Sequence, residues 1–241
     1  LKNIGEGAFF GCSGFTGPLI LPEGLTHIDR HAFSGCSGFT GSLTIPDGMT
    51  TIERGVFSGC SGFTGSLILP DDITVIDIAA FYGCSGFTGS LNLPSKLKMI
   101  RQMAFTNCSS ITGSLTLPEG LSEIEDEAFS GCSGFTELVL GNNVVSIYNK
   151  AFSDCSNISG KVIFPISLQY IASEAFFGCD KVNAFRFPHA APLGHSSEML
   201  PNGATIEVPL STVATYKVTD GWKDYKIVGY LPLSVDLPVI K

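Results

Sequence analysis

Apolar and polar residues alternate within a short phrase that returns along the chain. In Leu-x-Leu/Ile-Pro, as at Leu43–Pro46, alternate residues are apolar, which is the period-two pattern of a short strand with one buried face. A second apolar pair follows in each copy, as at Met49 and Ile52, and an Ala-Phe pair such as Ala32-Phe33 comes before it. We expect Ala-Phe to occupy one turn of helix or 3₁₀ helix. The phrase therefore predicts a coil of chain with three apolar walls.

Cysteines mark the period of this phrase, at intervals of 24 residues with one interval of 23, between Cys132 and Cys155. A fixed period of 20 to 29 residues indicates a solenoid, in which stacked coils share one core. The repeat covers about residues 1–188, or about eight coils, and residues 189–241 form a tail that does not repeat. We interpret the tail as a cap with a short strand and a helix.

Glycines in each coil predict its bends. Gly35 and Gly38 suit a positive φ or a close approach of two backbones. In the tail, we expect Ser211 to cap a helix with Val213 and Tyr216 on one face, and Trp222 to cover the last coil.

The cysteines could form disulfides, bind a metal or remain thiols. Equivalent positions on stacked coils point the same way, at the spacing of neighbouring strands, which exceeds the Cβ separation of about 3.5 to 4.5 Å that a disulfide needs. Metal ligation would need thiols that converge. We therefore expect a column of buried thiols, the thiol ladder, formed by Cys12, Cys36, Cys60, Cys84, Cys108, Cys132, Cys155 and Cys179.

Charge and hydropathy limit the classes of partner that we expect for this chain. The chain has 14 basic and 22 acidic residues, a formal net charge of −8, and its basic residues form no stripe, so we expect no nucleic acid partner. No uninterrupted apolar run approaches 18 residues, so we expect no membrane span. The chain begins at Leu1, inside a repeat and without a leader, and we expect that an export signal lies outside this sequence. The first coil would then present an uncovered core that could contact another molecule end to end.

The phrase Ile-x-x-x-Ala-Phe-x-Gly-Cys-Ser followed by Leu-x-Leu-Pro resembles the BspA-like leucine-rich repeat, also called the Treponema pallidum type. This resemblance implies a leucine-rich-repeat solenoid with a curved right-handed parallel β-sheet and short helical or 3₁₀ turns. It also implies a secreted or cell-surface protein of bacteria or some protists, with adhesion to host matrix proteins or other bacteria among the family's roles. The Thr-Gly-x-Leu-x-Leu-Pro wording is also similar to the plant-specific class of repeat.

The family's usual period is 23, so most coils here carry one extra residue in the Phe-Thr-Gly-Ser-Leu segment. We expect the added glycine to make a bulge. The segment Phe135–Leu140 has the shorter form.

Candidate chemistry outside the repeat is sparse. His27 and His31 form the one pair of histidines near enough in sequence to suggest a metal, but Ile28 between them points inward, which favours two unrelated exposed histidines. His189 and His195 lie beside Pro and Gly in an expected connecting loop. We find no nucleophile elbow and no phosphate-binding glycine loop, so we expect no enzyme and no cofactor.

Two columns of mostly acidic residues leave calcium as an alternative, because stacked carboxylates could bridge an ion. The first column is Glu23, Asp47, Asp71, Ser95 and Glu119, and the second is Asp29, Glu53, Asp77, Arg101 and Glu125. Acidic columns also keep solenoids soluble.

The outward positions of the Leu-x-Leu-Pro strands define the expected concave face. After Pro18 and Ile20, they are Ser42, Thr44, Ser66, Ile68, Ser90, Asn92, Ser114, Thr116, Glu137, Val139, Lys161 and Ile163. This face is rich in hydroxyl and aliphatic groups and carries charge only near its C-terminal end, which suits moderate contact with proteins or glycans. We predict a non-catalytic recognition or adhesion module whose partners are host matrix proteins, bacterial surface proteins or glycans. The alternative is a structural spacer without a ligand.

Overall fold

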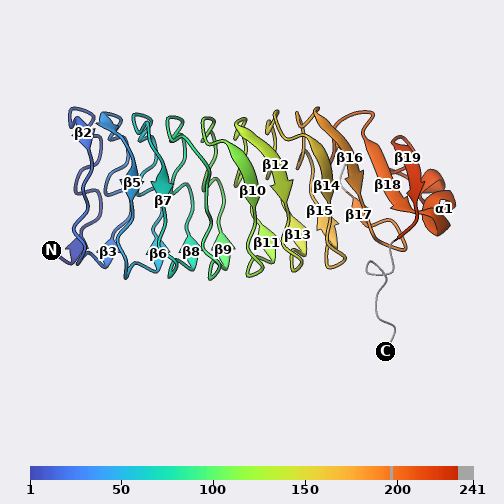
Figure 1. The fold of residues 1–241 in the computed structure, drawn as a ribbon, viewed down its shortest axis with the longest axis horizontal. Helices are drawn as coiled ribbons and strands as arrows, with labels where there is room; N and C mark the ends of the chain where they lie inside the picture. The colour runs from blue at the N-terminus through green and yellow to red at the C-terminus, as the bar shows by residue number, and fades with distance from the viewer. Residues whose placement is uncertain (196–197, 233–241) are drawn as a thin grey trace.

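The fold is a parallel β-solenoid of about ten turns with one short C-terminal helix, in a computed structural model that describes residues 1–195 and 198–232 (Figure 1). The coils stack along a nearly straight axis in Figure 1, from β1 at one end to β19 and α1 at the other. Among the described residues, no helix is long and apolar enough to cross a membrane.

Two columns of short strands run along the stack. The Ile wall, named for the buried Ile that ends most of its strands, contains β1 (Asn3–Ile4), β3 (His27–Ile28), β6 (Thr51–Ile52), β8 (Val75–Ile76), β9 (Met99–Ile100), β11 (Glu123–Ile124), β13 (Ser146–Ile147), β15 (Tyr170–Ile171) and β17 (Gly194–His195). The Leu wall, built on the Leu-x-Leu-Pro segments, contains β2 (Gly17–Pro18), β4 (Phe39–Thr40), β5 (Leu43–Thr44), β7 (Leu67–Ile68), β10 (Gly113–Thr116), β12 (Phe135–Val139), β14 (Gly160–Ile163), β16 (Val182–Arg186), β18 (Thr205–Pro209) and β19 (Lys226–Tyr230).

Most strands pair in parallel with the equivalent segment of a neighbouring coil. Ile52 lies opposite Ile76, and Leu43 lies opposite Leu67, which is a register of one whole repeat. Identical side chains therefore stack on themselves, and the core is one continuous column of buried Leu, Ile, Phe and Cys.

The Ala-Phe segment, which we call the Phe corner, contains turns and no helix. In the second coil, the amides of Ala32 and Cys36 bond to carbonyls three residues back in their own coil, whereas the amide of Phe33 bonds to Val56 O in the next coil at 2.9 Å. Left-handed residues at His31 (φ 55°) and Gly35 (φ 77°) flank the segment. The expected helical turn does not form, because these two residues interrupt it and turn alternate amides toward the neighbouring coil.

The bend glycines have the two expected roles. Gly35 adopts a positive φ, and a Cβ atom added at Gly62 would collide with the carbonyl oxygen of Ser37 in the preceding coil. The added glycine of the longer repeat also makes the predicted bulge, because the strand register shifts beside Gly113 and Gly160, whose φ angles are 87° and 73°.

Phenylalanine rings form a stack through the Phe corner. From Phe9 to Phe176, each ring lies parallel or nearly so to the next, with centroids 5.0 to 5.7 Å apart. A second column, which includes Phe39, Phe63 and Phe87, packs beside the first, with edge contacts such as the one between Phe81 and Phe87 at 6.4 Å. We did not predict this second column from the sequence, although its phenylalanines repeat with the same period.

The cysteines of the thiol ladder are free, and the seven from Cys36 to Cys179 are buried as predicted. From Cys36 to Cys179, each thiol donates a hydrogen bond to the carbonyl oxygen of the Phe-corner phenylalanine in the preceding coil, at 3.0 to 3.2 Å. Burial raises the pKa of Cys60, Cys132 and Cys179 to about 12 and that of Cys84 well above its ordinary value. Cys12, in the first coil, is half-buried.

The tail continues the solenoid. The Leu-wall sheet runs without a break from β14 and β16 to β18 and β19, so it crosses residue 188 and adds turns beyond the cysteine-bearing coils. The predicted strand is β18, and a second strand, β19, which we did not predict, follows the helical segment.

The helical segment consists of a 3₁₀ turn, η1 (Leu210–Thr212), and α1 (Val213–Val218). The prediction that Ser211 caps the helix is wrong, because Ser211 lies inside η1. The N-cap residue of α1 is Thr212, and its side chain makes no capping hydrogen bond. Tyr216 faces the core as expected, and Trp222 is fully buried, with its ring edge-to-face against Phe187 at 4.8 Å.

His189 lies in a connecting segment as expected, at the junction between the last cysteine-bearing coil and the tail, but it is buried there. Its side chain is 7% exposed, and neither ring nitrogen has a hydrogen-bond partner among the described residues. Phe187 lies beside the ring, and the hydroxyl of Tyr216 donates to the carbonyl oxygens of His189 and Ala191. Desolvation lowers the pKa of His189, and the nearby backbone at Leu168 and Ile166 opposes this only in part.

We predict that iodoacetamide at pH 8 labels Cys12 in the native chain and leaves the other seven thiols intact. Burial blocks access, and the raised thiol pKa values reduce the reactive thiolate, so labelling of Cys84 should be about a hundredfold slower or more. Intact-mass and peptide mass spectrometry measure the result, with a urea-unfolded sample as the control in which all eight react. Native labelling of the central cysteines, or masses reduced by disulfide formation, would refute the thiol ladder.

We also predict that the stability of the chain falls as pH decreases below about 6.5, in part through His189. Its folded pKa is lowered, so the unfolded chain binds more protons below the ordinary pKa, and the contribution of neutral His189 is complete above that pH and lost below it. Urea unfolding from pH 5 to 8 measures the free energy of unfolding at each pH. For the wild-type chain, this free energy should fall more steeply with decreasing pH than for His189→Leu, by at most about 1.4 kcal/mol per pH unit. His27→Gln serves as the control, and equal slopes for wild type and His189→Leu would contradict this role.

Candidate functional site

The expected concave face is the outer surface of the Leu wall, and all of its predicted residues lie outside the core. From Ser42 to Ile163 these side chains are exposed or half-buried, while the residues between them, such as Leu43 and Val162, are buried. The period-two pattern therefore placed the side chains correctly. Whether they bind a ligand stays a prediction.

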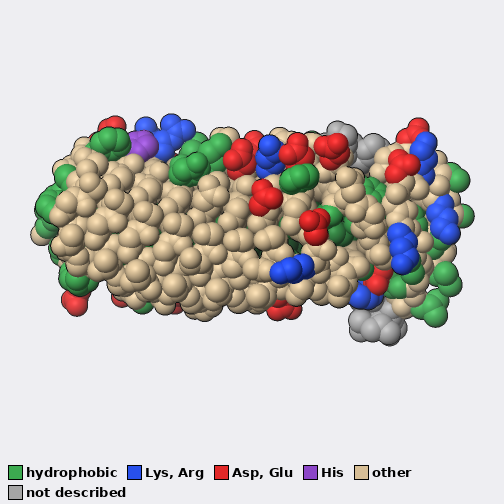
Figure 2. Space-filling model, turned by 90° about the horizontal axis from the view of Figure 1, so that it is seen from above, with side chains coloured by type: hydrophobic (Ala, Val, Ile, Leu, Met, Phe, Trp, Pro, Cys, Tyr) green, Lys and Arg blue, Asp and Glu red, His purple; other side chains and the backbone are tan. Residues whose placement is uncertain are grey.

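The hydroxyl-rich part of the Leu wall uses some of its side chains internally. The Ser42 hydroxyl accepts a hydrogen bond from the Ser66 amide at 3.0 Å, which links two coils. Ser42 and Thr44 also line a hollow of about 530 Å³ with Ile20 near the N-terminal end. Figure 2 looks down on the bends at the top of Figure 1 and shows that the N-terminal half of this side carries almost no charged side chains, whereas charges gather along one long edge and toward the C-terminal end.

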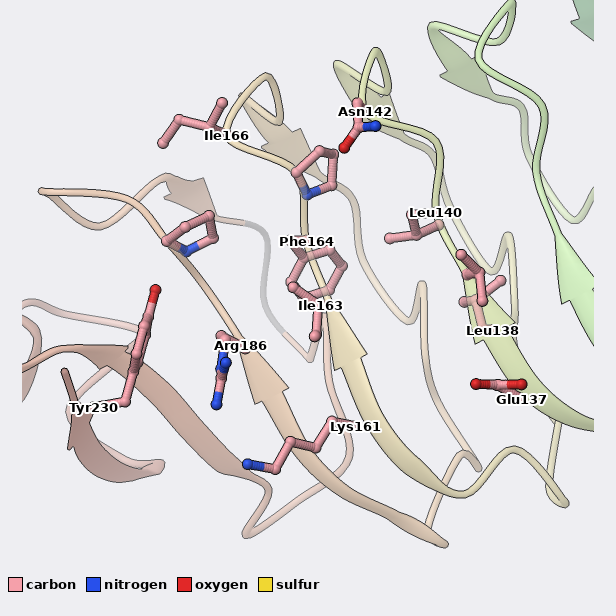
Figure 3. A pocket seen from close by; sticks show the side chains of 13 residues that line it. Glu137, Leu138, Leu140, Asn142, Lys161, Ile163, Phe164, Ile166, Arg186 and Tyr230 are labelled. Atoms are coloured by element: carbon pink, nitrogen blue, oxygen red, sulfur yellow. The ribbon is translucent and has the colours of Figure 1, made fainter. Parts of the chain in front are cut away.

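A groove of about 510 Å³ crosses the Leu wall at β12, β14 and β16, and extends to β19. Glu137, Val139, Lys161 and Ile163 line it, together with further residues that include Arg186 and Tyr230 (Figure 3). Four of the predicted outward residues are thus brought together. A volume of this size is typical of ligand pockets.

Aliphatic side chains form the upper part of this groove. Val139 is 42% exposed, Ile163 53% and Ile166 61%, although branched aliphatic residues are usually buried. Pro165 and Pro188 extend the apolar surface beside Ile166. This concentration of exposed aliphatic groups is the kind of patch that marks an interaction site.

Charged side chains form the lower part, around Glu207 of β18. Lys161 Nζ lies 2.6 Å from one oxygen of the Glu207 carboxylate, and Arg186 Nη2 lies 2.7 Å from the other. The guanidinium of Arg186 also lies 4.4 Å from the centre of the Tyr230 ring, a cation–π contact. Residues of four consecutive Leu-wall strands therefore form one cluster, the Glu207 cluster, defined as Lys161, Arg186, Glu207 and Tyr230.

The ion pairs determine the charge state of Glu207. Burial by itself would raise the pKa of this carboxyl, but hydrogen bonds from Lys161 and Arg186 outweigh burial and hold the pKa below its ordinary value. Glu207 is thus ionised at neutral pH. Two cations share this one half-buried carboxylate, so the cluster has one positive charge in excess.

Sequence reasoning missed Arg186, Glu207 and Tyr230. They lie at the end of the repeat or in the tail, where the Leu-x-Leu-Pro phrase is replaced by Ala184–Phe187, Ile206–Pro209 and Ile227–Tyr230. Alternating apolar residues in those segments were the signal that could have extended the face by further strands.

The histidine pair does not form a metal site. His27 lies in β3 and its Nε2 is 2.9 Å from Asp29 Oδ1, whereas His31 lies in the Phe corner with a left-handed backbone. His195 ends β17, and its side chain lies outside the described residues.

Several carboxylates of the two acidic columns have partners in the protein. Glu119 accepts hydrogen bonds from Asn142, Glu125 accepts one from the amide of Gln102, and Asp77 lies 3.5 Å from Arg101. In the described part of the chain, no group of three or more His, Cys, Asp or Glu side chains is arranged to hold a metal ion.

Comparison with solved structures finds bacterial leucine-rich repeat proteins of the same fold. A leucine-rich repeat protein from Bacteroides ovatus is 22% identical, with a TM-score of 0.70 over 95% of this chain and 64% of that one. A leucine rich cell surface protein from Faecalibacterium prausnitzii is 23% identical, with a TM-score of 0.54 over 98% of this chain and 71% of that one. The pneumococcal vaccine antigen PcpA is 16% identical, with a TM-score of 0.57 over 95% of this chain and 66% of that one.

These likenesses establish the fold. The chain spans about two thirds of the length of each of these three structures. No curated protein matches it.

A family model gives the assignment by sequence. The model of the BspA type leucine rich repeat region, which itself spans six copies of the repeat, matches residues 2–112 and 87–194 and so covers most of the chain. Members of this family are typically non-catalytic repeat proteins. The chain belongs to the BspA type leucine-rich repeat family.

Proposed function

We propose that this chain is a non-catalytic recognition module, secreted or exposed on a bacterial cell surface, and that it contacts its partner through the outer face of the Leu wall. The observation that carries the proposal is the groove in which Glu137, Val139, Lys161 and Ile163 meet Arg186 and Tyr230. Exposed aliphatic groups next to charged groups give both affinity and orientation at an interface.

Surface localisation is supported by the family and by the solved structures. One of the similar structures is a leucine rich cell surface protein, and another is a vaccine antigen. The candidate partners are host matrix proteins, surface proteins of other bacteria, and glycans.

A second candidate function is a structural spacer. The regular stacking of coils favours it, because hydroxyl groups of the Leu wall such as that of Ser42 bond to a neighbouring coil. Substitutions on the outer surface of the Leu wall should change partner binding if the chain is a recognition module, and should change only solubility if it is a spacer.

We predict that Ile163→Asp and Lys161→Glu each weaken binding at least tenfold, or about 1.4 kcal/mol, because the first places a charge on the apolar part of the groove and the second removes a cation. Surface plasmon resonance against matrix proteins, flow cytometry with bacterial cells and a glycan array measure binding of the 241-residue protein.

The matched controls are Met99→Asp and Lys98→Glu, which change an exposed apolar residue and an exposed cation at the Ile wall. They should bind as wild type does. Binding that the groove variants and the controls reduce equally would refute the groove, and a wild-type chain that binds no surface would favour the spacer.

A further inference from the structure

The groove has an apolar part and a charged part side by side. Resting on the proposed function, we infer that it receives a segment of a partner protein in which an acidic side chain lies next to an aliphatic side chain. The charges of the groove residues, the exposed fractions of their side chains and their ring contacts point to this kind of ligand.

The apolar part of the groove favours a protein side chain over a sugar. Its exposed groups are the branched side chains Val139, Ile163 and Ile166, which bury area against other aliphatic groups and offer no flat aromatic surface. Of the aromatic rings that line the groove, Phe164 is 1% exposed, and Tyr230 already carries the Arg186 guanidinium against its ring. A sugar would thus find little ring surface on which to stack.

The charged part of the groove favours a carboxylate. Lys161 and Arg186 share the single carboxylate of Glu207, which is 14% exposed, so the two cations together exceed their internal partner by one charge. Their side chains are 45% and 26% exposed, so both reach the groove surface. A ligand carboxylate placed against Lys161 and Arg186 would complete the pairing.

Glu137 sets the direction of the ligand. Figure 3 shows Glu137 on the other side of Ile163 from Arg186 and Tyr230, so the groove has an acid on one side and the cations on the other. A matching segment would place a carboxylate toward Arg186, an aliphatic side chain over Ile163, and a Lys, Arg or amide donor toward Glu137. Opposite charges across an interface fix register in this way.

The first test selects ligands without assuming a partner. A phage-displayed library of random 12-residue peptides is panned against the immobilised protein, and the retained phage are eluted with soluble protein. We expect enriched sequences with Asp or Glu within two residues of Leu, Ile or Val. Binding of a synthetic enriched peptide should fall at least tenfold with Lys161→Glu or Ile163→Asp, and when its acidic residue is changed to the amide.

Conservative variants separate chemistry from folding. Lys161→Arg keeps the positive charge and should retain peptide binding, whereas Lys161→Glu removes it, and far-ultraviolet circular dichroism should be the same for both. Enriched peptides that lack acidic residues, or that bind all groove variants equally, would overturn the inference, as would a library that yields no enriched sequence.

A second test distinguishes this inference from the proposed function. A matrix or bacterial surface that binds the wild-type chain is treated either with proteinase K or with periodate, which destroys vicinal diols of glycans. Loss of binding after proteinase K alone is the expected result. If periodate alone abolishes binding that still depends on Ile163, the recognition module stands and the inference of a protein ligand falls, whereas failure of all binding overturns both.

Discussion

Each coil depends on the next through the carbonyl group of its corner phenylalanine. Phe57 O accepts one hydrogen bond from the Cys60 amide of its own coil at 3.1 Å and another from the Cys84 thiol of the following coil at 3.0 Å. The first bond closes the corner, and the second ties it to its neighbour. If the following coil moved, the carbonyl would keep the bond from the Cys60 amide, but the buried Cys84 thiol would lose its acceptor, and a buried polar group left without a partner costs about 1 to 3 kcal/mol.

This constraint explains why the core positions are nearly the same in every coil, whereas the outward positions differ from coil to coil. A cysteine is small enough for the corner and carries a donor, so it satisfies packing and hydrogen bonding together. The stacked phenylalanine rings beside it need the same residue in every coil, because each ring packs on a copy of itself. The outward residues of the Leu wall lie outside the core, and hydroxyl groups, aliphatic chains and charges follow one another there.

The sequence predicted what the repeat determines. Alternation in Leu-x-Leu-Pro identified the strands, and the period identified parallel stacking and free thiols, because equivalent residues must lie above one another. The helical turn at Ala-Phe was wrong because backbone geometry at His31 and Gly35 decides it, and left-handed conformations at residues other than glycine have weak sequence signals.

The groove could be predicted only in part, for a related reason. Glu137, Lys161 and Ile163 belong to the repeat, but Arg186, Glu207 and Tyr230 come from segments where the phrase has lost its cysteine, its proline or its spacing. Arg186, Glu207 and Tyr230 lie close together because β18 and β19 continue the sheet beside β16. Strand pairing of this kind depends on tertiary contacts, so a local sequence pattern does not predict it.

Loss of repetition and gain of specificity are therefore linked at the C-terminal end. A face whose coils are alike presents the same group at every step, so a ligand could shift by one coil at little cost and would have no defined register. The Glu207 cluster removes that degeneracy, because its cations, its carboxylate and its aromatic ring each occur on a different strand. The repeat supplies the rigid spacing, and the departure from the repeat supplies a unique site on it.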